Sequence, residues 1–299
     1  MGKKIVVLLM ALMLVLSMAA CSSGDPAGST DPNEANGSGE ANGSNGENGA
    51  GGEGEAVESG DVGSLTVAEG KFTVGFDQNF PPMGFIGDDG EFTGFDLELA
   101  AEVADRLGLE LVLQPIAWDA KDMELSSKNI DCIWNGFTIN GREDLYTWTD
   151  PYMSNNQVFV VRADSGISTL ADLAGKTVLV QVDSSAEAAL ADRPDLVETF
   201  GEYLTASDYN IALMDLESGA VDAVAMDDTV ANFQIESREK DFVILEEKLA
   251  AEDYGVGFLL GNEALRDVVQ ATLEEMAADG KMAEISNKWF GKDITTIGK

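Results

Sequence analysis

Residues 177–191 read TVLVQVDSSAEAALA, which indicates a buried strand that runs directly into a helix. The strand part, 177–182, is dominated by apolar residues, Val above all, which pack well on a pleated sheet. Ser184 and Glu187 then stand three residues apart, the spacing of a capping box that closes the first turn of a helix. A strand that leads into a capped helix is the repeating unit of α/β folds, so this stretch indicates an α/β fold.

The same alternation continues on both sides of this stretch, from residue 64 onward. Apolar runs predict further strands over 72–76, 109–113, 130–134, 158–162, 221–226 and 254–260. Helical signals predict helices over 96–107, 168–175, 208–217 and 262–279, with others that open at 227–229 and end near Trp289. Gly108 is expected to end the first helix, whose spacing is set by Leu97, Ala101, Ala104 and Leu107.

Capping residues mark the boundaries of the other helices. Ser168 is expected to cap a short helix that ends at Gly175, and Asp208 a longer one that Gly219 stops. Strands that alternate with helices predict an α/β fold with open, mostly parallel sheets covered by helices. Ligands of such sheets bind beyond the carboxyl ends of the strands. Two sheets offer two such edges, so we expect the ligand in a cleft between them.

The composition argues against several classes of function. The 299 residues include 54 acidic and 18 basic ones, and the formal net charge of −36 opposes binding to nucleic acid. There is no His, the commonest general base and metal ligand, and the two Cys are Cys21 and Cys132. We therefore expect no metal site, no cofactor and no disulfide framework. Cys132 lies in an apolar run and is predicted to be a small core residue.

The N-terminus has the pattern of a secretory signal. Two Lys precede an unbroken apolar run over 5–16, and small residues lead on to Cys21. The run is shorter than the roughly 20 residues of a membrane span, and an uncleaved anchor is the alternative. Met18-Ala19-Ala20-Cys21 also resembles a bacterial lipobox, with Met where Leu is usual. The resemblance implies a signal peptide over 1–20 and a Cys21 that carries acyl groups such as palmitate, which anchor the chain to the outer face of the cell membrane.

Residues 21–63 are predicted to form a disordered, acidic tether behind this lipidated Cys. The stretch from 22 onward is dominated by Gly, Ser, Asn, Glu and Asp, and it contains no Lys, Arg, aromatic residue, Leu or Ile. Such a segment cannot bury enough apolar surface to offset the entropy of ordering. It is expected to hold a folded domain away from the membrane.

Candidate site residues fall just after the predicted strands, where ligand-binding groups are expected. They are Asp77, Phe80, Trp118, Gly136, Thr138, Arg142, Ser184, Ser185 and Asp227.

These residue types suit a free amino acid, which carries a carboxylate, an ammonium group and a side chain. Arg142 is suited to bind the carboxylate bidentately, and the amides at the start of the Ser184 helix are suited to the same anion. Asp227 is suited to the ammonium, with the Gly136 carbonyl and the Thr138 hydroxyl as further acceptors. The remaining candidates are suited to the ligand side chain. Phe80 and Trp118 provide aromatic walls, and Asp77 provides a carboxylate for a polar or cationic group.

Each candidate also has a purely structural interpretation. Arg142 could instead be a solvated surface residue, which is the lesser alternative, and Ser184 and Asp227 both have the positions of helix caps. Phe80 and Trp118, taken singly, are more often core residues. The prediction rests on five strand ends that together present groups suited to one ligand.

In combination these segments resemble the polar amino acid-binding proteins of bacterial ABC importers, over residues 70–292. The matching segments, in this order, are 75–82 (GFDQNFPP), 94–100 (GFDLELA), 131–139 (DCIWNGFTI), 149–152 (TDPY), 181–187 (QVDSSAE), 221–227 (VDAVAMD) and 288–291 (KWFG). Any one of them alone is unspecific, whereas their order and spacing are specific to this family.

The resemblance implies a fold of two α/β lobes joined by two crossovers, the type II periplasmic-binding-protein-like fold, with open mixed sheets and the ligand cleft between the lobes. Lobe 1 is expected over 64–160 and 252–299, and lobe 2 over 161–251. The implied function is that of a monomeric, extracytoplasmic subunit without enzymatic activity, which binds a free amino acid and delivers it to a membrane permease. The family's carboxylate contacts fall on Arg142, Ser184 and Ser185, its ammonium contacts on Asp227, Gly136 and Thr138, and its aromatic walls on Phe80 and Trp118.

Two departures from the family pattern bear on the site. The segment 138–142 is one residue shorter than usual, which affects the aim of Arg142. Asp183 stands where Gly is common, and its carboxylate must point away from the anion or oppose its binding. Two other functions fit the same fold: a lipoprotein that senses a solute without transport, and a lyase, which in the absence of His would need a carboxylate of raised pKa or a Lys.

Overall fold

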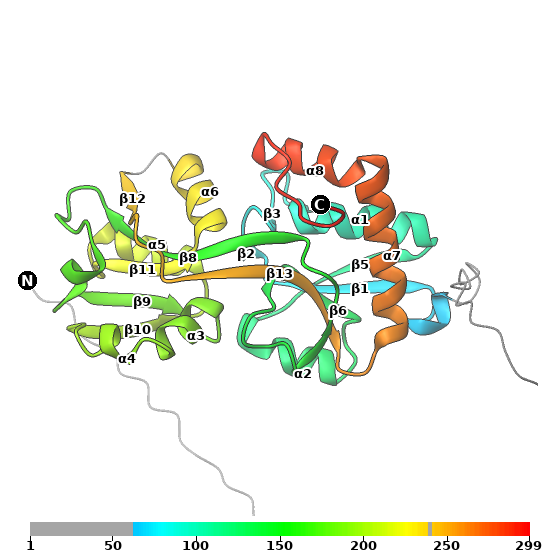
Figure 1. Cartoon of the computed structure of the whole chain (residues 1–299), viewed down its shortest axis with the longest axis horizontal. Coiled ribbons are helices and arrows are strands. Elements are labelled where there is room, and N and C mark those ends of the chain that lie inside the picture. The colour runs from blue at the N-terminus through cyan, green and yellow to red at the C-terminus, as the bar shows by residue number, and fades with distance from the viewer. Residues whose placement is uncertain (1–61, 239–240) are drawn as a thin grey trace, which may run out of the picture. The chain divides into compact units, whose positions relative to one another are not determined.

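The computed structural model describes residues 62–238 and 241–299 (Figure 1). The predicted signal peptide, Cys21 and all but the last residues of the predicted tether lie outside these ranges. Within them, no helix is both long and apolar enough to cross a membrane.

A ten-stranded sheet organises the described residues, in the order β10-β9-β11-β8-β13-β6-β1-β5, with β12 paired to β8 and β7 to β13. A smaller three-stranded sheet has the order β2-β3-β4. The strands are β1 (Lys71–Phe76), β2 (Asn79–Phe80), β3 (Gly84–Ile86), β4 (Phe92–Thr93), β5 (Glu110–Pro115), β6 (Cys132–Thr138), β7 (Tyr146–Trp148), β8 (Met153–Arg162), β9 (Thr177–Gln181), β10 (Glu202–Ala206), β11 (Ala223–Asp227), β12 (Phe242–Ile244) and β13 (Ala250–Leu259).

The long strands β8 and β13 join the two wings of this sheet (Figure 1). They pair antiparallel from Gln157↔Ala250 to Met153↔Tyr254. In the wings β1 pairs parallel with β5 and β6, and β9 pairs parallel with β10 and β11. The expectation of mostly parallel pairing is therefore correct in the wings. It is wrong at their junction, where the two crossover strands pair with each other and with β6 and β11 in antiparallel fashion.

We call the wing with β1, β5 and β6 the first lobe and the wing with β9, β10 and β11 the second lobe. The expected boundaries, 160/161 and 251/252, fall inside β8 and β13. The first lobe carries α1 (Phe95–Leu107), α2 (Lys121–Ser126), α7 (Glu263–Asp279) and α8 (Lys281–Phe290), and the second carries α3 (Ser185–Ala191), α4 (Pro194–Val197), α5 (Tyr209–Ser218) and α6 (Asp228–Arg238). Three short 3₁₀ helices are η1 (Val62–Leu65), η2 (Trp118–Ala120) and η3 (Leu170–Leu173).

Helices cover both faces of each wing because the strands are apolar on both faces. In β6, Cys132 and Trp134 join the cluster that includes α1, whereas Ile133 and Phe137 join a second cluster with Leu125 of α2. Cys132 is fully buried, which confirms its prediction as a core residue. Strands that are buried on both faces hold their carboxyl ends in fixed positions, and these ends carry the candidate residues.

Most predicted helices are present close to their expected bounds. Gly108 ends α1 and Gly219 ends α5, both with a left-handed φ, and the Asp208 side chain caps α5 through the Ile211 N–H, 3.0 Å away. Ala101, however, is exposed, so the buried side of α1 is formed instead by Phe95, Asp96, Leu97, Leu99, Ala100, Val103 and Ala104.

Two local predictions near the second lobe are wrong. The segment after Ser168 forms only the 3₁₀ helix η3, and its N-cap is Thr169, which makes a reciprocal capping box with Asp172. In α3 the Ser184 hydroxyl accepts from the Glu187 N–H at 3.1 Å, as expected. The Glu187 carboxylate, however, accepts from the Asp183 N–H at 2.6 Å, one residue before the position that a capping box requires.

Candidate functional site

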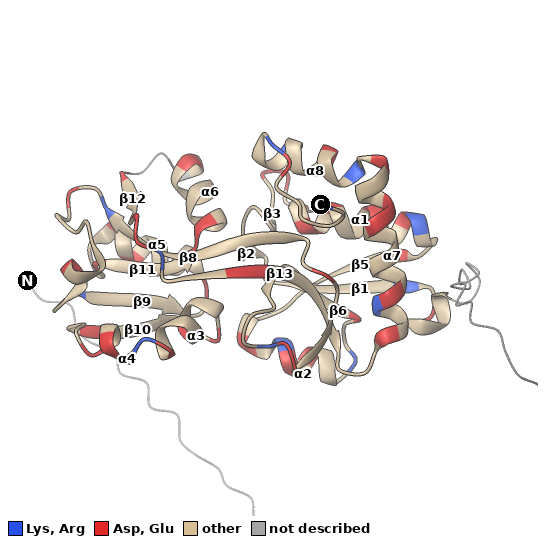
Figure 2. Ribbon diagram, viewed as in Figure 1, with Lys and Arg blue, Asp and Glu red and all other residues tan. Residues whose placement is uncertain are grey.

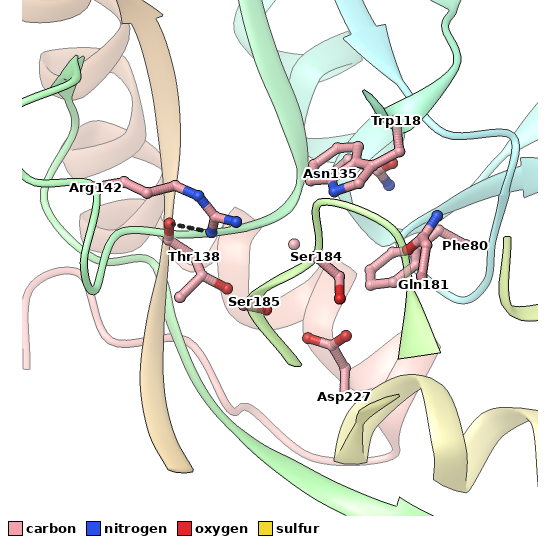
Figure 3. A pocket seen from close by; sticks show the side chains of 10 residues that line it. Phe80, Trp118, Asn135, Thr138, Arg142, Gln181, Ser184, Ser185 and Asp227 are labelled. Atoms are coloured by element: carbon pink, nitrogen blue, oxygen red, sulfur yellow. Dashed lines mark hydrogen bonds between the residues drawn. The ribbon is translucent and has the colours of Figure 1, made fainter. Parts of the chain in front are cut away.

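A pocket with an empty volume of about 280 Å³, including the space at its mouth, lies between the two lobes (Figure 3). It is lined by Phe80, Trp118, Asn135, Gly136, Thr138 and Arg142 from the first lobe and by Gln181, Ser184, Ser185 and Asp227 from the second. The lining combines charged, amide and hydroxyl groups with aromatic rings. A few convergent polar groups beside aromatic walls are typical of a site for a small molecule.

The structure brings together in this pocket every residue predicted for the site except Asp77. Asp77 is buried behind the lining, where its carboxylate accepts from the Gln181 side-chain amide at 2.9 Å and from the Asn79 N–H at 2.8 Å. Burial raises the pKa of Asp77. Asp77 therefore does not line the pocket itself, but it is hydrogen-bonded to Gln181, which does.

Sequence reasoning missed two lining residues, Asn135 and Gln181. Gln181 ends β9, so the rule that ligand groups follow strands applied to it as well. Asn135 lies inside β6, because that strand continues to Thr138. Gly136 and Thr138 were expected after a strand that ended at 134. The strand is longer because Phe137 and Thr138 pair with Gly255 and Tyr254 of β13.

Gly136 has a backbone conformation that suits glycine. Its φ of 56° is left-handed, and a Cβ at this position would lie 3.0 Å from the Phe80 ring and 3.1 Å from the Tyr254 ring. Its N–H donates to the Asp96 carboxylate at 2.5 Å. Asp96, at the start of α1, is fully buried and also accepts from the Tyr152 hydroxyl at 2.9 Å. Burial raises the pKa of Asp96 to about 7, against the opposing effect of these hydrogen bonds.

Arg142 extends its guanidinium group into the pocket (Figure 3). The group donates to the Thr138 carbonyl at 3.3 Å and to the Asp183 carbonyl at 3.5 Å, and it lies 5.4 Å from the Phe137 ring centroid. A turn closed by the Arg142 N–H and the Ile139 carbonyl, 2.8 Å apart, brings the short segment 138–142 back to the pocket. Arg142 thus contacts both lobes.

Asp183 connects the lobes at the side of Arg142. Its φ of 57° is left-handed, and its carbonyl accepts from Trp118 Nε1 at 3.1 Å as well as from Arg142. Its carboxylate forms an ion pair with Lys121 of α2, which is 1% exposed and lies over the Trp118 ring. The carboxylate is absent from the pocket lining, so the expected conflict with an anion is removed by pairing to Lys121.

The start of α3 presents two hydroxyl groups to the pocket. Ser184 is buried and caps the helix, and the Ser185 hydroxyl accepts from the Gln157 side-chain amide at 2.9 Å. Because α3 has only seven residues, its dipole is small. We therefore attribute any anion contact here to the individual hydroxyl and amide groups.

Asp227, the last residue of β11, lies across the pocket from Arg142 (Figure 3). Its carboxylate accepts from the side chains of Asn155, Gln157 and Tyr254 at 3.0, 2.8 and 2.6 Å. Burial and then the nearby charge of Glu252 raise the pKa of Asp227 well above its usual range. Sequence reasoning missed these partners, because the crossover strands β8 and β13 that carry them showed no motif for this position.

The described residues contain no group of three or more His, Cys, Asp and Glu side chains arranged to hold a metal ion. The chemistry available in the pocket is that of one guanidinium group, one buried carboxylate, several hydroxyl and amide groups, and two aromatic rings. Such a set can bind a small molecule that carries both charges.

A family model described as "Bacterial extracellular solute-binding proteins, family 3" matches residues 72–292. Among curated proteins, the L-cystine-binding protein TcyJ of Escherichia coli (strain K12) is 34% identical over 229 residues, which cover 76% of this chain and 85% of TcyJ.

Solved structures give a consistent result. An ABC uptake transporter substrate-binding protein from Streptococcus pneumoniae with bound histidine has a TM-score of 0.76 and 35% identity, and the match covers 80% of this chain and 99% of that one. The protein Tv2483 bound to L-arginine has a TM-score of 0.75 and 25% identity, with coverage of 81% and 98%. The two-lobe fold, with its pocket between the lobes, is thus the fold of proteins that bind amino acids.

Proposed function

The chain belongs to the bacterial extracellular solute-binding proteins of family 3, and on that premise we propose that it binds a free amino acid between its lobes and delivers it to an ABC permease. The proposal includes a monomeric chain anchored by acyl groups on Cys21 to the outer face of the cell membrane, with the acidic segment after Cys21 as a tether. Because the family consists of solute-binding proteins, we propose no catalytic step.

The observation that carries the proposal is the placement of opposite charges across one small pocket. Arg142 of the first lobe and Asp227 of the second line opposite sides of it (Figure 3). A zwitterionic amino acid presents a carboxylate that Arg142 can bind in a fork and an ammonium group that suits Asp227. In this arrangement the Ser184 and Ser185 hydroxyls support the carboxylate end, and the Gly136 carbonyl and Thr138 hydroxyl support the ammonium end.

Binding is proposed to stabilise the closed arrangement of the lobes, because the ligand contacts both of them. A ligand shifts such an equilibrium only through a difference in affinity for the open and closed states. The Asp183 carbonyl and carboxylate add interlobe contacts to Trp118, Arg142 and Lys121. We propose that these contacts assist closure and that the permease recognises the closed form.

The ligand side chain is proposed to be polar. Phe80 and Trp118 supply aromatic walls, whereas Gln181, with Asp77 behind it, supplies hydrogen-bonding groups. The relatives named above bind L-cystine, histidine and L-arginine, all with polar side chains. Asp77 is proposed to favour a side chain that donates hydrogen bonds or carries positive charge.

A thermal-shift screen tests this function. The chain from residue 22 onward is purified under denaturing conditions, refolded without ligand and screened against the twenty amino acids and cystine. An amino acid present at 100 times its Kd stabilises the fold by about 2.7 kcal/mol, which raises Tm by several degrees. We expect shifts confined to one chemical class of amino acid. A well-folded protein that shows no shift with any of them would rule out the proposed function.

A further inference from the structure

Glu252 lies behind the ammonium side of the pocket, on crossover strand β13. Figure 2 shows an acidic segment on β13, and Glu252 and Asp253 lie in the first half of this strand. Glu252 is only 5% exposed and Asp227 only 2% exposed, and neither the strand pattern nor the resemblance marks Glu252. Asp253, next along the strand, points elsewhere: its carboxylate accepts from the Ser154 hydroxyl at 2.7 Å.

The side chains of Asp227 and Glu252 share their hydrogen-bond donors. The Asn155 amide donates to Asp227 at 3.0 Å and to Glu252 at 2.6 Å, and the Gln157 amide is 2.8 Å from both carboxylates. The second Glu252 oxygen accepts from the hydroxyl of Thr138, which lines the pocket, at 3.0 Å. Glu252 therefore binds Thr138 directly, and it shares with Asp227 the two amides that position both carboxylates.

This cluster has more acceptors than donors. The Gln157 Nε2 group has two hydrogens but three acceptors within 2.9 Å, namely Ser185, Asp227 and Glu252. Gln157 Oε1 is buried without a hydrogen-bond partner in the described part of the chain. No Lys or Arg of that part forms an ion pair with either carboxylate. Two buried like charges without a cation cannot both remain ionised at low cost, so the site needs either a proton or a cation.

We propose that Glu252 is a positioning residue for the ligand's ammonium group, and that the Asp227–Glu252 pair holds one proton which the ammonium group displaces on binding. The inference rests on the proposed function. Before binding, one carboxyl is protonated and one is ionised. The incoming ammonium keeps its three hydrogens, the shared proton leaves to water, and both carboxylates then face one cation. The charge of the site stays at one negative unit in both states.

The surroundings of the pair act in both directions. The Tyr254 hydroxyl of β13 donates to Asp227, which favours the ionised carboxylate, but burial and the charge of Glu252 outweigh this and raise the pKa of Asp227. Tyr209 of α5, also fully buried, has its pKa raised by burial and by the same acidic charges, so it supplies no cation. Asp228 opens α6 beside Asp227 and binds the Asn156 amide at 2.9 Å. The charged groups named on this side are all acidic, and Arg142 lies across the pocket. The pair therefore retains its proton more readily than an isolated carboxylate does.

The test measures proton release and affinity by titration calorimetry between pH 5.5 and 8, in buffers of different ionisation enthalpy. L-Arginine and L-cystine serve as probes; L-histidine is avoided because its imidazole titrates in the same range. The wild type is expected to release close to one proton per ligand at the acidic end, with affinity rising as much as tenfold per pH unit until the pair is ionised. In Glu252→Gln the repulsive charge is gone, so the release and the pH dependence should fall markedly. Asp253→Asn, with the same change in charge on the other side of β13, should behave as the wild type.

The outcomes separate the two proposals. Binding without proton release in the wild type, or an unchanged pH profile in Glu252→Gln, would overturn the role of Glu252 and leave amino acid binding intact. If no amino acid bound, the proposed function would fail. The proton would then be sought in the ligand-free protein by carboxyl-carbon NMR, with signals assigned through Asp227→Asn and Glu252→Gln. Two ionised carboxylates at pH 6 would refute the shared proton, and one protonated carboxyl that is lost in Glu252→Gln would support it.

Discussion

Replacement of Arg142 by Ala is expected to weaken amino acid binding by tens- to thousands-fold. Loss of one partner from a buried, hydrogen-bonded charge pair costs about 2–5 kcal/mol, mostly because the other charge is left without a partner. Here the ligand carboxylate would keep the hydroxyls of Ser184 and Ser185 but lose its only cationic contact among the lining residues. Titration calorimetry with the best amino acid from the screen measures the effect.

Two further variants make the test specific. Arg142→Lys keeps the charge but loses the planar fork, so its affinity should lie between those of the wild type and Arg142→Ala. Arg193→Ala removes an Arg from the second lobe that pairs with Asp195, away from the pocket lining, and it should leave the affinity unchanged. An unchanged Kd in Arg142→Ala, with its fold intact by circular dichroism, would contradict the carboxylate-binding role.

Asp96→Asn is expected to change the pH dependence of stability strongly. Burial raises the pKa of Asp96 from 3.8 to about 7 in the folded chain, so between these values the folded state binds more protons than the unfolded one. The stabilisation contributed by the Asp96 proton is therefore fully present below about pH 4, and it is lost as the pH rises to about 7. The linked free energy is on the order of 4 kcal/mol.

An Asn at this position keeps an acceptor for the Gly136 N–H and the Tyr152 hydroxyl but has no proton to lose. The variant should match the wild type near pH 4.5 and exceed it in free energy of unfolding near pH 8, as measured by urea denaturation across this range. Asp105→Asn, on the exposed side of the same helix, should run parallel to the wild type. Parallel curves for Asp96→Asn and wild type would show that Asp96 does not titrate as proposed. Asp77, Asp131 and Asp227 also have raised pKa values and add to the slope in all the proteins compared.

Local signals in the sequence predicted the alternation of strands and helices well. Gly108, Gly219 and Asp208 mark helix ends through their own conformational preferences, which need no tertiary partner. The lengths of β6, β8 and β13 were underestimated, since pairing between strands far apart in the sequence extends them. The two wings form one sheet, where two sheets were expected, because of the same pairing between strands that are far apart in the sequence.

The candidate site was predictable where a residue follows a strand and carries a suitable group. Arg142 and Ser184 follow strands and Asp227 ends one, and the structure places all three around one pocket. Glu252, Gln157 and Asn155 were not predictable, because a crossover strand shows no sign in the sequence of which face borders the ligand. Lys121 was missed for a related reason, since its partner Asp183 belongs to the other lobe. Partners of buried charges emerge only from the tertiary structure.

A crystal structure of the complex with the best amino acid of the screen tests the central claim most directly. The account predicts the ligand carboxylate within hydrogen-bonding distance of the Arg142 guanidinium and of the Ser184–Ser185 region, and the ammonium group within the same reach of Asp227. Its side chain should extend between Phe80 and Trp118 toward Gln181. A ligand bound in the reverse orientation, or outside this pocket, would contradict the account.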